Sequence, residues 1–236
     1  MQLILIPGLW LVGSSWNEVT PVLEAAGHRV HALTLPGMGS RRLDRSGITL
    51  RDHVEEVIDI IDALEAQDPE KVVLVAHSAG GALAHAAADA RPERVARVVY
   101  VASEPRPDGQ KGDGGWFVER GEVALPPWES FGEEMLVGLD EELRVLVRAR
   151  SIPSPEGVVT GEQKLYDDRR YGIPITMVMC ELPSIVLRRA VAAREPGTEE
   201  LAKIASVSYL DLPTGHWPQF SRPQELGRVL ALAVAG

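Results

Sequence analysis

Six short apolar runs, each four to eight residues long, constrain the fold of this chain more than any other feature. They are unbroken rather than alternating, which is typical of strands buried on both faces of a parallel sheet. Longer segments with helical periodicity separate them, so strand and helix alternate along the chain. The sequence therefore predicts an α/β fold with a mostly parallel six-stranded sheet flanked by helices, its strands at residues 3–6, 30–35, 72–76, 95–101, 173–180 and 207–212.

Three helices are predicted between and after these strands. The first begins at a capping box at residues 49–52 and carries its apolar residues on one face. The second covers residues 82–91 and is stopped by Pro92, because proline cannot continue a helix. The third starts near Pro223, a residue that suits the first helical position.

The alternation breaks once, at residues 105–172, where Gly, Pro and acidic residues become frequent. Structureless loops of this length are uncommon in compact domains. The helical-looking stretch at residues 133–150 carries an apolar stripe of Leu136, Leu139, Leu143 and Val147. We therefore expect an inserted helical cap at residues 105–172 and a core formed by residues 1–104 and 173–236. The alternative is a disordered linker.

Charge and cysteine content narrow the partners and the location. The chain has 236 residues, enough for one sizeable core, and its formal charge of −10 disfavours nucleic acid and anionic lipid as partners. No apolar run approaches the roughly 20 residues of a membrane helix. The single cysteine, Cys180, permits no internal disulfide, and the first residues are typical of a strand rather than a signal peptide. We expect a cytoplasmic protein that binds a small neutral or apolar molecule, and neither nucleic acid nor membrane; the oligomeric state is not indicated.

The most informative segment is residues 72–83, a buried strand, a sharp turn centred on Ser78 and a helix of small residues. Such a turn needs small residues two before and two after the serine, because the backbone approaches itself there, and Ala76 and Gly80 meet that need. The turn projects the hydroxyl beyond the end of the strand and directs the amide of Ala79 to the same place. This pattern is typical of a nucleophile elbow; the alternative is a serine that caps the helix.

A second segment, residues 211–223, contains His216 in the loop between the last strand and the last helix. A serine hydroxyl is a weak nucleophile at neutral pH and needs an adjacent base, which an imidazole can supply. Of the six histidines, His216 alone follows the carboxyl end of a strand across a glycine turn. Packing or surface roles explain the others better, and His77 is expected to pack beside the elbow.

The loop at residues 6–16 offers a second donor for a negatively charged oxygen. A tetrahedral oxyanion needs two convergent N–H groups, and a glycine-relaxed loop beside the elbow can direct the amide of Leu9, or alternatively of Trp10, to the same point as that of Ala79. The glycine spacing does not match a nucleotide-binding loop, since G-x-G-x-x-G and a following Gly-Lys-Ser/Thr are both missing. We expect no cofactor and no metal site.

Together, Ser78 followed by His216, an early glycine loop and an insertion after the fourth strand resemble the α/β-hydrolase superfamily over nearly the whole chain. The motifs that carry the resemblance are AHSAG at the elbow, LPGMGS after the second strand and GHWPQFSRPQEL near the end. The chain resembles a serine esterase of a short form that begins at the third strand of the usual fold. This implies an α/β-hydrolase fold with Ser78 as nucleophile and His216 as base.

The acid that orients the histidine is harder to assign. In the family it normally follows the fourth or the fifth of the strands present here, and neither position holds an aspartate. Our first candidate is Glu104 and our second is Glu181, each two or three residues from a strand end. The extra methylene of glutamate can recover a small displacement. The alternative is that both are surface carboxylates and that a backbone carbonyl or water holds His216.

We therefore predict a hydrolase that cleaves a small carboxylic ester or lactone through an acyl-Ser78 intermediate, with the amides of Leu9 and Ala79 in the oxyanion hole. One alternative is a lyase, similar to hydroxynitrile lyases, that uses the same site without hydrolysis. Another is a ligand-binding, catalytically weakened relative, because no orienting acid stands at the usual place.

Five tryptophans outnumber the four tyrosines and the three phenylalanines. Trp10 follows the predicted oxyanion loop, Trp217 follows the predicted base, and Trp116 and Trp128 lie in the insertion. We expect these four indoles to bind substrate by surrounding one apolar cleft above Ser78. The alternative for Trp116 and Trp128 is that they form the core of the cap.

Overall fold

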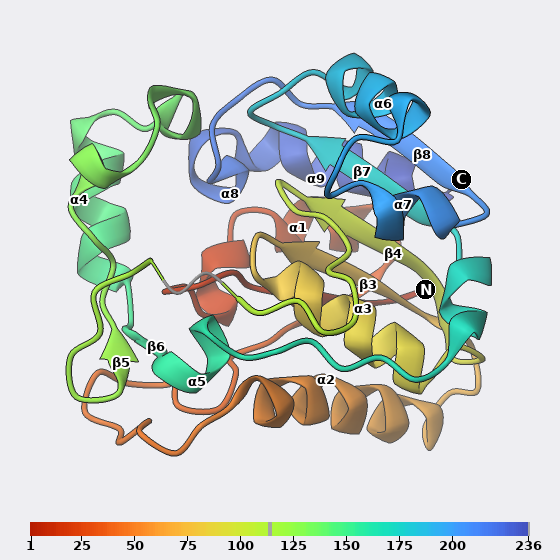
Figure 1. Cartoon of the computed structure of the whole chain (residues 1–236), viewed down its shortest axis with the longest axis horizontal. Coiled ribbons are helices and arrows are strands. Elements are labelled where there is room, and N and C mark those ends of the chain that lie inside the picture. The colour runs from red at the N-terminus through yellow and green to blue at the C-terminus, as the bar shows by residue number, and fades with distance from the viewer. Residues whose placement is uncertain (113–114, 236) are drawn as a thin grey trace.

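The computed structural model describes residues 1–112 and 115–235 and has a six-stranded parallel sheet at its centre (Figure 1). The strand order is β2-β1-β3-β4-β7-β8, and every neighbouring pair is parallel. The α/β class and the six-stranded sheet are therefore confirmed. The strands are β1 (Gln2–Ile6), β2 (Arg29–Ala32), β3 (Val72–His77), β4 (Val95–Val101), β7 (Ile175–Met179) and β8 (Val207–Asp211).

Burial differs between the centre of the sheet and its edges. Every residue of β1 and β3 is buried, whereas every residue of the edge strands β2 and β8 is exposed or half-buried. The expectation that all six strands are buried on both faces is wrong for these two. An edge strand has a neighbour on one side only, and its other side remains open to solvent.

Helices cover both faces of the sheet. The helices α2 (Leu50–Glu65) and α3 (Gly80–Ala90) share one core with alternate residues of β1, and α1 (Thr20–Ala25) and α9 (Pro223–Ala235) share another with the remaining ones. Successive side chains of a strand point to opposite faces, so each inner strand contributes to both cores. None of the helices in the described part of the chain is long and apolar enough to cross a bilayer. The other helical segments outside the insertion are η1 (Gly13–Trp16), α6 (Ser184–Ala193), α7 (Glu199–Lys203) and α8 (Pro218–Ser221).

The helix boundaries follow the local signals in the sequence. Thr49 caps α2, and its side chain and that of Asp52 form the reciprocal hydrogen bonds of a capping box. The helix α3 begins at Gly80, two residues before the predicted start, and ends at Ala90, just ahead of Pro92. The last helix starts at Pro223 as predicted.

The insertion between β4 and β7 combines short helices with a two-stranded antiparallel ribbon. The helical-looking stretch at residues 133–150 divides in two, because Gly138 has a φ of 81° and Asp140 starts a new helix by accepting a hydrogen bond from the Leu143 amide at 2.9 Å. The boundaries 105–172 stay a prediction, and residues 113 and 114 lie outside the described ones. The elements are β5 (Glu122–Val123), η2 (Trp128–Ser130), η3 (Glu133–Leu136), α4 (Glu141–Arg150), β6 (Ser154–Pro155), α5 (Glu156–Val159) and η4 (Asp168–Gly172).

The described residues of the insertion have a core of their own. Val123, Phe131 and Val147 are buried in one apolar cluster together with Trp10 and Trp217, which follow β1 and β8. The insertion therefore packs against loops at the carboxyl edge of the sheet, and its described part is not the disordered linker of the alternative interpretation.

The order of the strands reverses at β1, and this reversal positions the functional site. β2 lies on one side of β1 and β3 on the other, with Ile6 paired to Ala76. The loops that follow β1 and β3 lead in opposite directions, which leaves a crevice at their carboxyl ends where open α/β sheets bind ligands. The loop after Ile6 and the turn at Ser78 meet at this crevice.

A buried network of charged residues ties the end of the insertion to α3 and α7. The carboxylate of Asp89 accepts hydrogen bonds from the amides of Tyr166 and Asp167, both at 2.8 Å, and pairs with Arg170 at 3.1 Å. Arg170 also pairs with Glu200 at 3.1 Å, and all three charged side chains of these pairs are buried. Each charge in the network therefore depends on its partners.

Replacing Asp89 by alanine is expected to lower the free energy of unfolding by about 3–5 kcal/mol, because Arg170 and two amides lose a buried acceptor. Urea unfolding followed by circular dichroism measures the change. Asp59→Ala is the matched control, since this carboxylate is exposed on α2, and its loss should change the free energy of unfolding by less than about 0.5 kcal/mol. Equal effects of the two substitutions would contradict a structural role of the network.

Candidate active site

Ser78 lies on the sharp turn between β3 and α3 with a φ of 52°, in the left-handed region. A serine is strained in this conformation, so its surroundings must hold it. A Cβ on Gly80 would lie 2.8 Å from the carbonyl oxygen of Pro7, and a Cβ on Gly8 would lie 2.8 Å from the Cβ of Ser78. Glycine is needed at both positions, because the loop after β1 passes directly against the turn.

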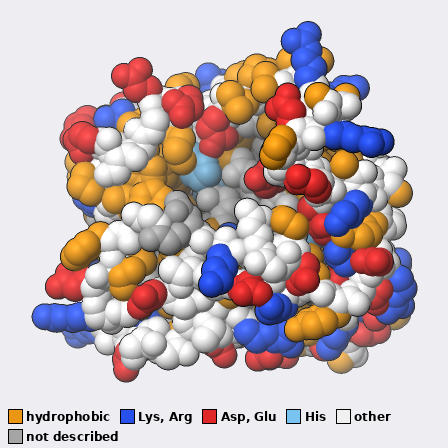
Figure 2. Space-filling view, in the orientation of Figure 1, with side chains coloured by type: hydrophobic (Ala, Val, Ile, Leu, Met, Phe, Trp, Pro, Cys, Tyr) orange, Lys and Arg blue, Asp and Glu red, His pale blue; other side chains and the backbone are white. Residues whose placement is uncertain are grey.

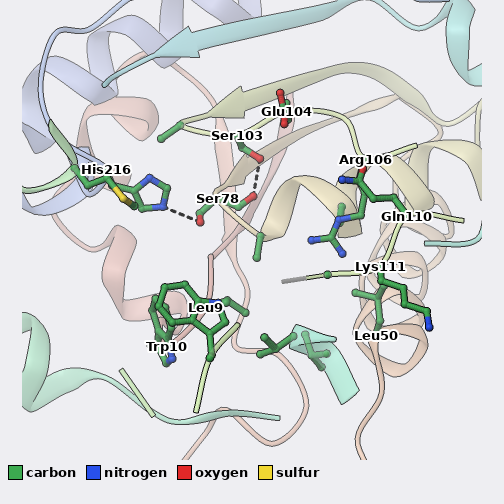
Figure 3. A pocket seen from close by; sticks show the side chains of 18 of the residues that line it. Leu9, Trp10, Leu50, Ser78, Ser103, Glu104, Arg106, Gln110, Lys111 and His216 are labelled. Atoms are coloured by element: carbon green, nitrogen blue, oxygen red, sulfur yellow. Dashed lines mark hydrogen bonds between the residues drawn. The ribbon is translucent and has the colours of Figure 1, made fainter. Parts of the chain in front are cut away.

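Two hydrogen bonds from the neighbouring strand hold the turn. The amide of Ser78 donates to the carbonyl of Val101 at 3.1 Å, and the hydroxyl of Ser103 donates to the carbonyl of Ser78 at 2.5 Å (Figure 3). Sequence reasoning assigned no role to Ser103. Its place directly after a strand that neighbours the elbow strand was the signal that could have found it.

His216 lies in the loop between β8 and α8, with its Nε2 2.8 Å from the Oγ of Ser78 (Figure 3). The insertion holds this loop, because the amides of Gly215 and His216 donate to the carbonyls of Val137 at 2.9 Å and Met135 at 2.8 Å. The two segments pass so closely that a Cβ on Gly215 would lie 2.3 Å from the Met135 oxygen. The insertion therefore positions the histidine as well as covering the sheet edge.

The carboxylate that contacts His216 is Glu181 and not Glu104. The Nδ1 of His216 donates to Glu181, which leaves Nε2 free to accept the hydroxyl proton of Ser78. Our first candidate, Glu104, makes no hydrogen bond or ion pair with His216 within the described residues, and the preference for it is wrong. The reason is the strand order: Glu181 follows β7, which neighbours β8 and its loop, whereas Glu104 follows β4, one strand further away.

The pKa values of the two carboxyl groups shift in opposite directions. Burial alone would raise the pKa of Glu181, but the hydrogen bond and the attraction of the His216 ring hold that pKa below its ordinary value. Burial raises the pKa of Glu104. Glu181 is therefore the carboxylate suited to stabilise a positive charge on the histidine.

A second imidazole, that of His77, is buried beside the elbow and does more than the expected packing. Its Nε2 lies 2.6 Å from the carbonyl oxygen of His216. Burial, together with the nearby His216 ring, lowers the pKa of His77 to about 3, so this ring is neutral at physiological pH. The neutral ring donates its Nε2 hydrogen to that carbonyl and ties the histidine loop to the strand that carries Ser78. Trp16 packs edge-on against His77 with 6.5 Å between the ring centroids.

Two backbone amides beside Ser78, those of Leu9 and Ala79, have no hydrogen-bond acceptor within residues 1–112 and 115–235. Both residues line the cavity above the serine. The alternative donor considered from the sequence, the amide of Trp10, instead donates to the Oγ of Ser154 at 2.8 Å. Leu9 and Ala79 are therefore the pair that can donate to an oxygen bound at Ser78.

A cavity of about 450 Å³ opens over Ser78 and His216. Figure 2 shows it as a hollow with a histidine side chain at its floor. Its apolar lining includes aromatic side chains and aliphatic ones such as Met135 and Val158, and other lining residues carry charged and amide groups. The polar part is formed by Glu104, Arg106, Gln110 and Lys111.

Of the four tryptophans predicted to surround the cleft, two line it. Trp10 and Trp116 form part of the wall, with 5.6 Å between their ring centroids. Trp128 and Trp217 do not; their rings lie edge-to-face, 5.5 Å apart, in the apolar cluster of the insertion. The prediction is wrong for these two because Phe131, whose ring contacts all four indoles, takes the place at the cavity wall.

The arrangement can perform nucleophilic chemistry on a carbonyl group. It unites a hydroxyl nucleophile, an imidazole acceptor, a carboxylate that holds the imidazole and two amides open to an oxyanion. In the part of the chain that the structure describes, no group of three or more His, Cys, Asp or Glu side chains could hold a metal ion. The single cysteine, Cys180, is buried, and burial raises its pKa.

Comparison with known proteins agrees with the fold. The sequence model described as "Alpha/beta hydrolase family" matches residues 3–229, and the chain belongs to this family. A solved structure that resembles it is that of a pyrethroid hydrolase from Sphingobium faniae, with a TM-score of 0.73, 25% sequence identity and coverage of 100% of this chain and 98% of that one.

Three curated relatives illustrate the sequence similarity. Methylesterase 7 of Arabidopsis thaliana is 38% identical over 103 residues, which are 43% of this chain and 39% of that protein. The chain thus spans about two-fifths of the length of this relative, and the same holds for salicylic acid-binding protein 2 of Nicotiana tabacum, at 38%. Methyl jasmonate esterase 1 of Vitis vinifera is 27% identical over 240 residues, 89% of this chain and 88% of that protein.

The depressed pKa of His77 predicts a pH dependence of stability. In the unfolded chain His77 binds a proton below about pH 6.5, whereas in the folded chain it does so only near pH 3. The neutral buried ring therefore contributes its full share of the free energy of unfolding above pH 6.5, and this share is lost as the pH falls toward 3. His77→Gln keeps an N–H donor and removes the titration. Between about pH 6 and pH 4 we expect the free energy of unfolding to fall by about 1.4 kcal/mol per pH unit more in the wild type than in the variant. Urea unfolding at several pH values measures both slopes, and equal slopes would contradict the buried neutral ring.

Proposed function

We propose that the protein is a serine hydrolase that cleaves a carboxylic ester through an acyl-Ser78 intermediate. The observation that carries the proposal is the chain of hydrogen bonds from Ser78 through His216 to Glu181, beside the open amides of Leu9 and Ala79. Membership of the alpha/beta hydrolase family supports it. So do the names of the similar proteins, a methylesterase, a methyl jasmonate esterase and a pyrethroid hydrolase.

In the first step the Oγ of Ser78 attacks the ester carbonyl carbon while Nε2 of His216 takes the hydroxyl proton. The carbonyl oxygen becomes negative and accepts hydrogen bonds from the amides of Leu9 and Ala79. Glu181 stays ionised and stabilises the imidazolium through Nδ1. The bond to the leaving oxygen then breaks, His216 donates its proton to the departing alcohol, and the acyl group remains on Ser78.

In the second step water replaces the alcohol. The water oxygen attacks the acyl carbon while His216 takes a proton from the water. The bond between the acyl carbon and the Oγ of Ser78 then breaks, and the serine recovers its proton from His216. The product is the carboxylic acid. Throughout both steps the hydrogen bond from His77 to the His216 carbonyl keeps the loop that carries His216 in place.

The substrate is proposed to be a small carboxylic ester or lactone whose apolar part lies against Trp10, Trp116 and Phe131. The similarity to methylesterases supports a small leaving alcohol such as methanol. A cytoplasmic location and the lack of nucleic-acid, membrane and cofactor partners stay predictions from the sequence.

The two alternatives gain no support from the site. A catalytically weakened relative was considered because no orienting acid was evident, and the contact between Glu181 and His216 removes that reason. A lyase would use the same serine and histidine, and no described group of the cavity favours it over hydrolysis.

A fluorophosphonate probe tests the nucleophile. We expect it to bond to the Oγ of Ser78 with loss of fluoride, and Ser78→Ala to give no adduct and to lower kcat for 4-nitrophenyl butanoate by at least about 10³-fold. Mass spectrometry of the labelled peptide and the release of nitrophenol are the measurements. Thr214→Ser, which keeps a hydroxyl in the loop that carries His216, is the control variant and should still form the adduct. The proposal is wrong if the wild type neither forms the adduct nor hydrolyses nitrophenyl esters.

Two glutamate substitutions test the orienting acid. Glu181→Gln is expected to lower kcat by about 10²- to 10⁴-fold, because an amide does not stabilise the charged ring or its tautomer. Glu104→Gln is the matched control from the same cavity and should change kcat by less than about threefold. Both are measured by steady-state kinetics on 4-nitrophenyl butanoate, with circular dichroism to establish folding. A larger loss in Glu104→Gln would transfer the orienting role to Glu104.

A further inference from the structure

Arg106 brings a positive charge into the wall of the cavity at the start of the insertion. Its Nη1 is buried and has no hydrogen-bond partner in the described part of the chain. Figure 3 shows the guanidinium pointing into the cavity, toward the side on which Ser78 lies. A guanidinium has five N–H donors and remains charged in proteins, so a buried one without an acceptor is costly unless something else supplies the acceptor.

Among the described residues, the neighbouring carboxylates do not supply that acceptor. Glu104 lines the same cavity, but Figure 3 shows it apart from the guanidinium, and no ion pair joins it to Arg106 within the described residues. Asp108 accepts a hydrogen bond from the Leu165 amide at 2.9 Å. Glu162 contacts Lys164. The described chain thus leaves the charge of Arg106 uncompensated.

The segment that follows Arg106 is held by backbone hydrogen bonds. Residues 109–112 run antiparallel to residues 161–163, with hydrogen bonds of 2.9 Å from Gly109 to Gln163 and from Gln163 to Gln110, and of 3.0 Å from Gly112 to Gly161. Gln163 is fully buried and donates from its side chain to the carbonyl of Ala82 at 3.0 Å, at the start of α3. Residues 109–112, just after Arg106, are therefore fixed to the helix that follows Ser78. This attachment limits how far the Arg106 charge can move relative to the nucleophile.

The lining of the cavity combines two chemically different kinds of side chain. Trp10, Trp116 and Phe131 line it with apolar surface, whereas Arg106 and Lys111 bring positive charge, and Ser78 lies in the same cavity. The overall charge of −10 acts on an anion mainly at long range, where salt screens charges beyond about 8 Å. Inside the cavity the nearest cations decide which ligand is bound.

We propose that the ester hydrolysed at Ser78 carries a second, anionic group, a carboxylate, that binds Arg106, so that the substrate class is the half-ester of a dicarboxylic acid. This rests on the function proposed above and replaces the expectation of a neutral or apolar substrate. A carboxylate can accept two parallel hydrogen bonds from a guanidinium, which fixes both its position and its orientation. The carboxylate takes no part in bond breaking, so the reaction is the same acyl transfer to Ser78 and then to water.

The test compares two matched ester series on the wild type and on Arg106→Met. The anionic series is the monomethyl esters of succinic, glutaric and adipic acids, and the neutral series is the corresponding dimethyl esters. For at least one chain length we expect the wild type to prefer the monomethyl ester by about tenfold or more in kcat/KM. Arg106→Met should lower kcat/KM for that monomethyl ester by about 10- to 100-fold, mainly through KM, and change it for the dimethyl ester by less than about threefold.

Two further variants separate recognition from structure. Lys111→Met removes an exposed cation of the same cavity and should reduce kcat/KM for the monomethyl ester less than Arg106→Met does. Arg106→Lys keeps the charge without the planar pair of donors and should give an intermediate loss. Equal losses for both ester series in Arg106→Met, or a wild type that does not prefer any monomethyl ester, would overturn the inference.

A binding measurement distinguishes this inference from the proposed function. Isothermal titration calorimetry with adipate, glutarate and succinate requires no turnover, and we expect at least one of them to bind the wild type at least about tenfold more tightly than Arg106→Met. If no ester is hydrolysed and no phosphonate adduct forms, but Arg106→Met still weakens dicarboxylate binding, the proposed function fails and the anion site stands. Equal dissociation constants for the two proteins overturn the anion site whatever the activity.

Discussion

The structure depends on the left-handed turn at Ser78 and on the close backbone approach that makes the turn possible. A serine at a φ of 52° is strained, and two hydrogen bonds hold it there. The Ser78 amide donates to the carbonyl of Val101 in β4, and the hydroxyl of Ser103, just after β4, donates to the Ser78 carbonyl. Gly8 and Gly80 allow the loop after β1 to lie against the turn. Because this contact occurs where the strand order reverses, it also brings the amides of Leu9 and Ala79 to the cavity beside Ser78, at the carboxyl edge of the sheet.

The insertion is part of the site as much as a cover over it. Its carbonyls at Met135 and Val137 hold the loop of His216 from outside, while His77 holds the same loop from the elbow strand. Further along, the insertion builds the cationic wall and fixes it to α3 through Gln163. A loop attached to two separate parts of the fold has little freedom to move, so the distance between base and nucleophile is set by tertiary contacts rather than by the loop itself.

Local sequence signals predicted most of the elements. The six apolar runs became the six strands, and the capping box and Pro223 marked the starts of α2 and α9, because hydrophobic pattern and capping act within a few residues. The partial exposure of the edge strands could not be predicted, because the sequence of a strand does not show how many neighbouring strands it will have. The break in the helical stretch at Gly138 could have been predicted, because glycine readily takes a positive φ and Asp140 is a good helix cap.

By itself, the sequence determined which residues can do chemistry: a serine between a buried strand and a small-residue helix, and a histidine after the last strand, both recognisable because the backbone geometry that presents them is local. Only the tertiary structure decided which groups meet them. Glu181 contacts His216 and Glu104 does not, because β7 and not β4 neighbours the strand before the histidine. Trp128 and Trp217 pack behind Phe131 instead of lining the cavity. Arg106 lines the cavity, and the segment just after it, residues 109–112, is held by hydrogen bonds to residues 161–163. Contacts between distant segments depend on strand order and on which side chains fill the available space, and neither can be deduced from a short stretch of sequence.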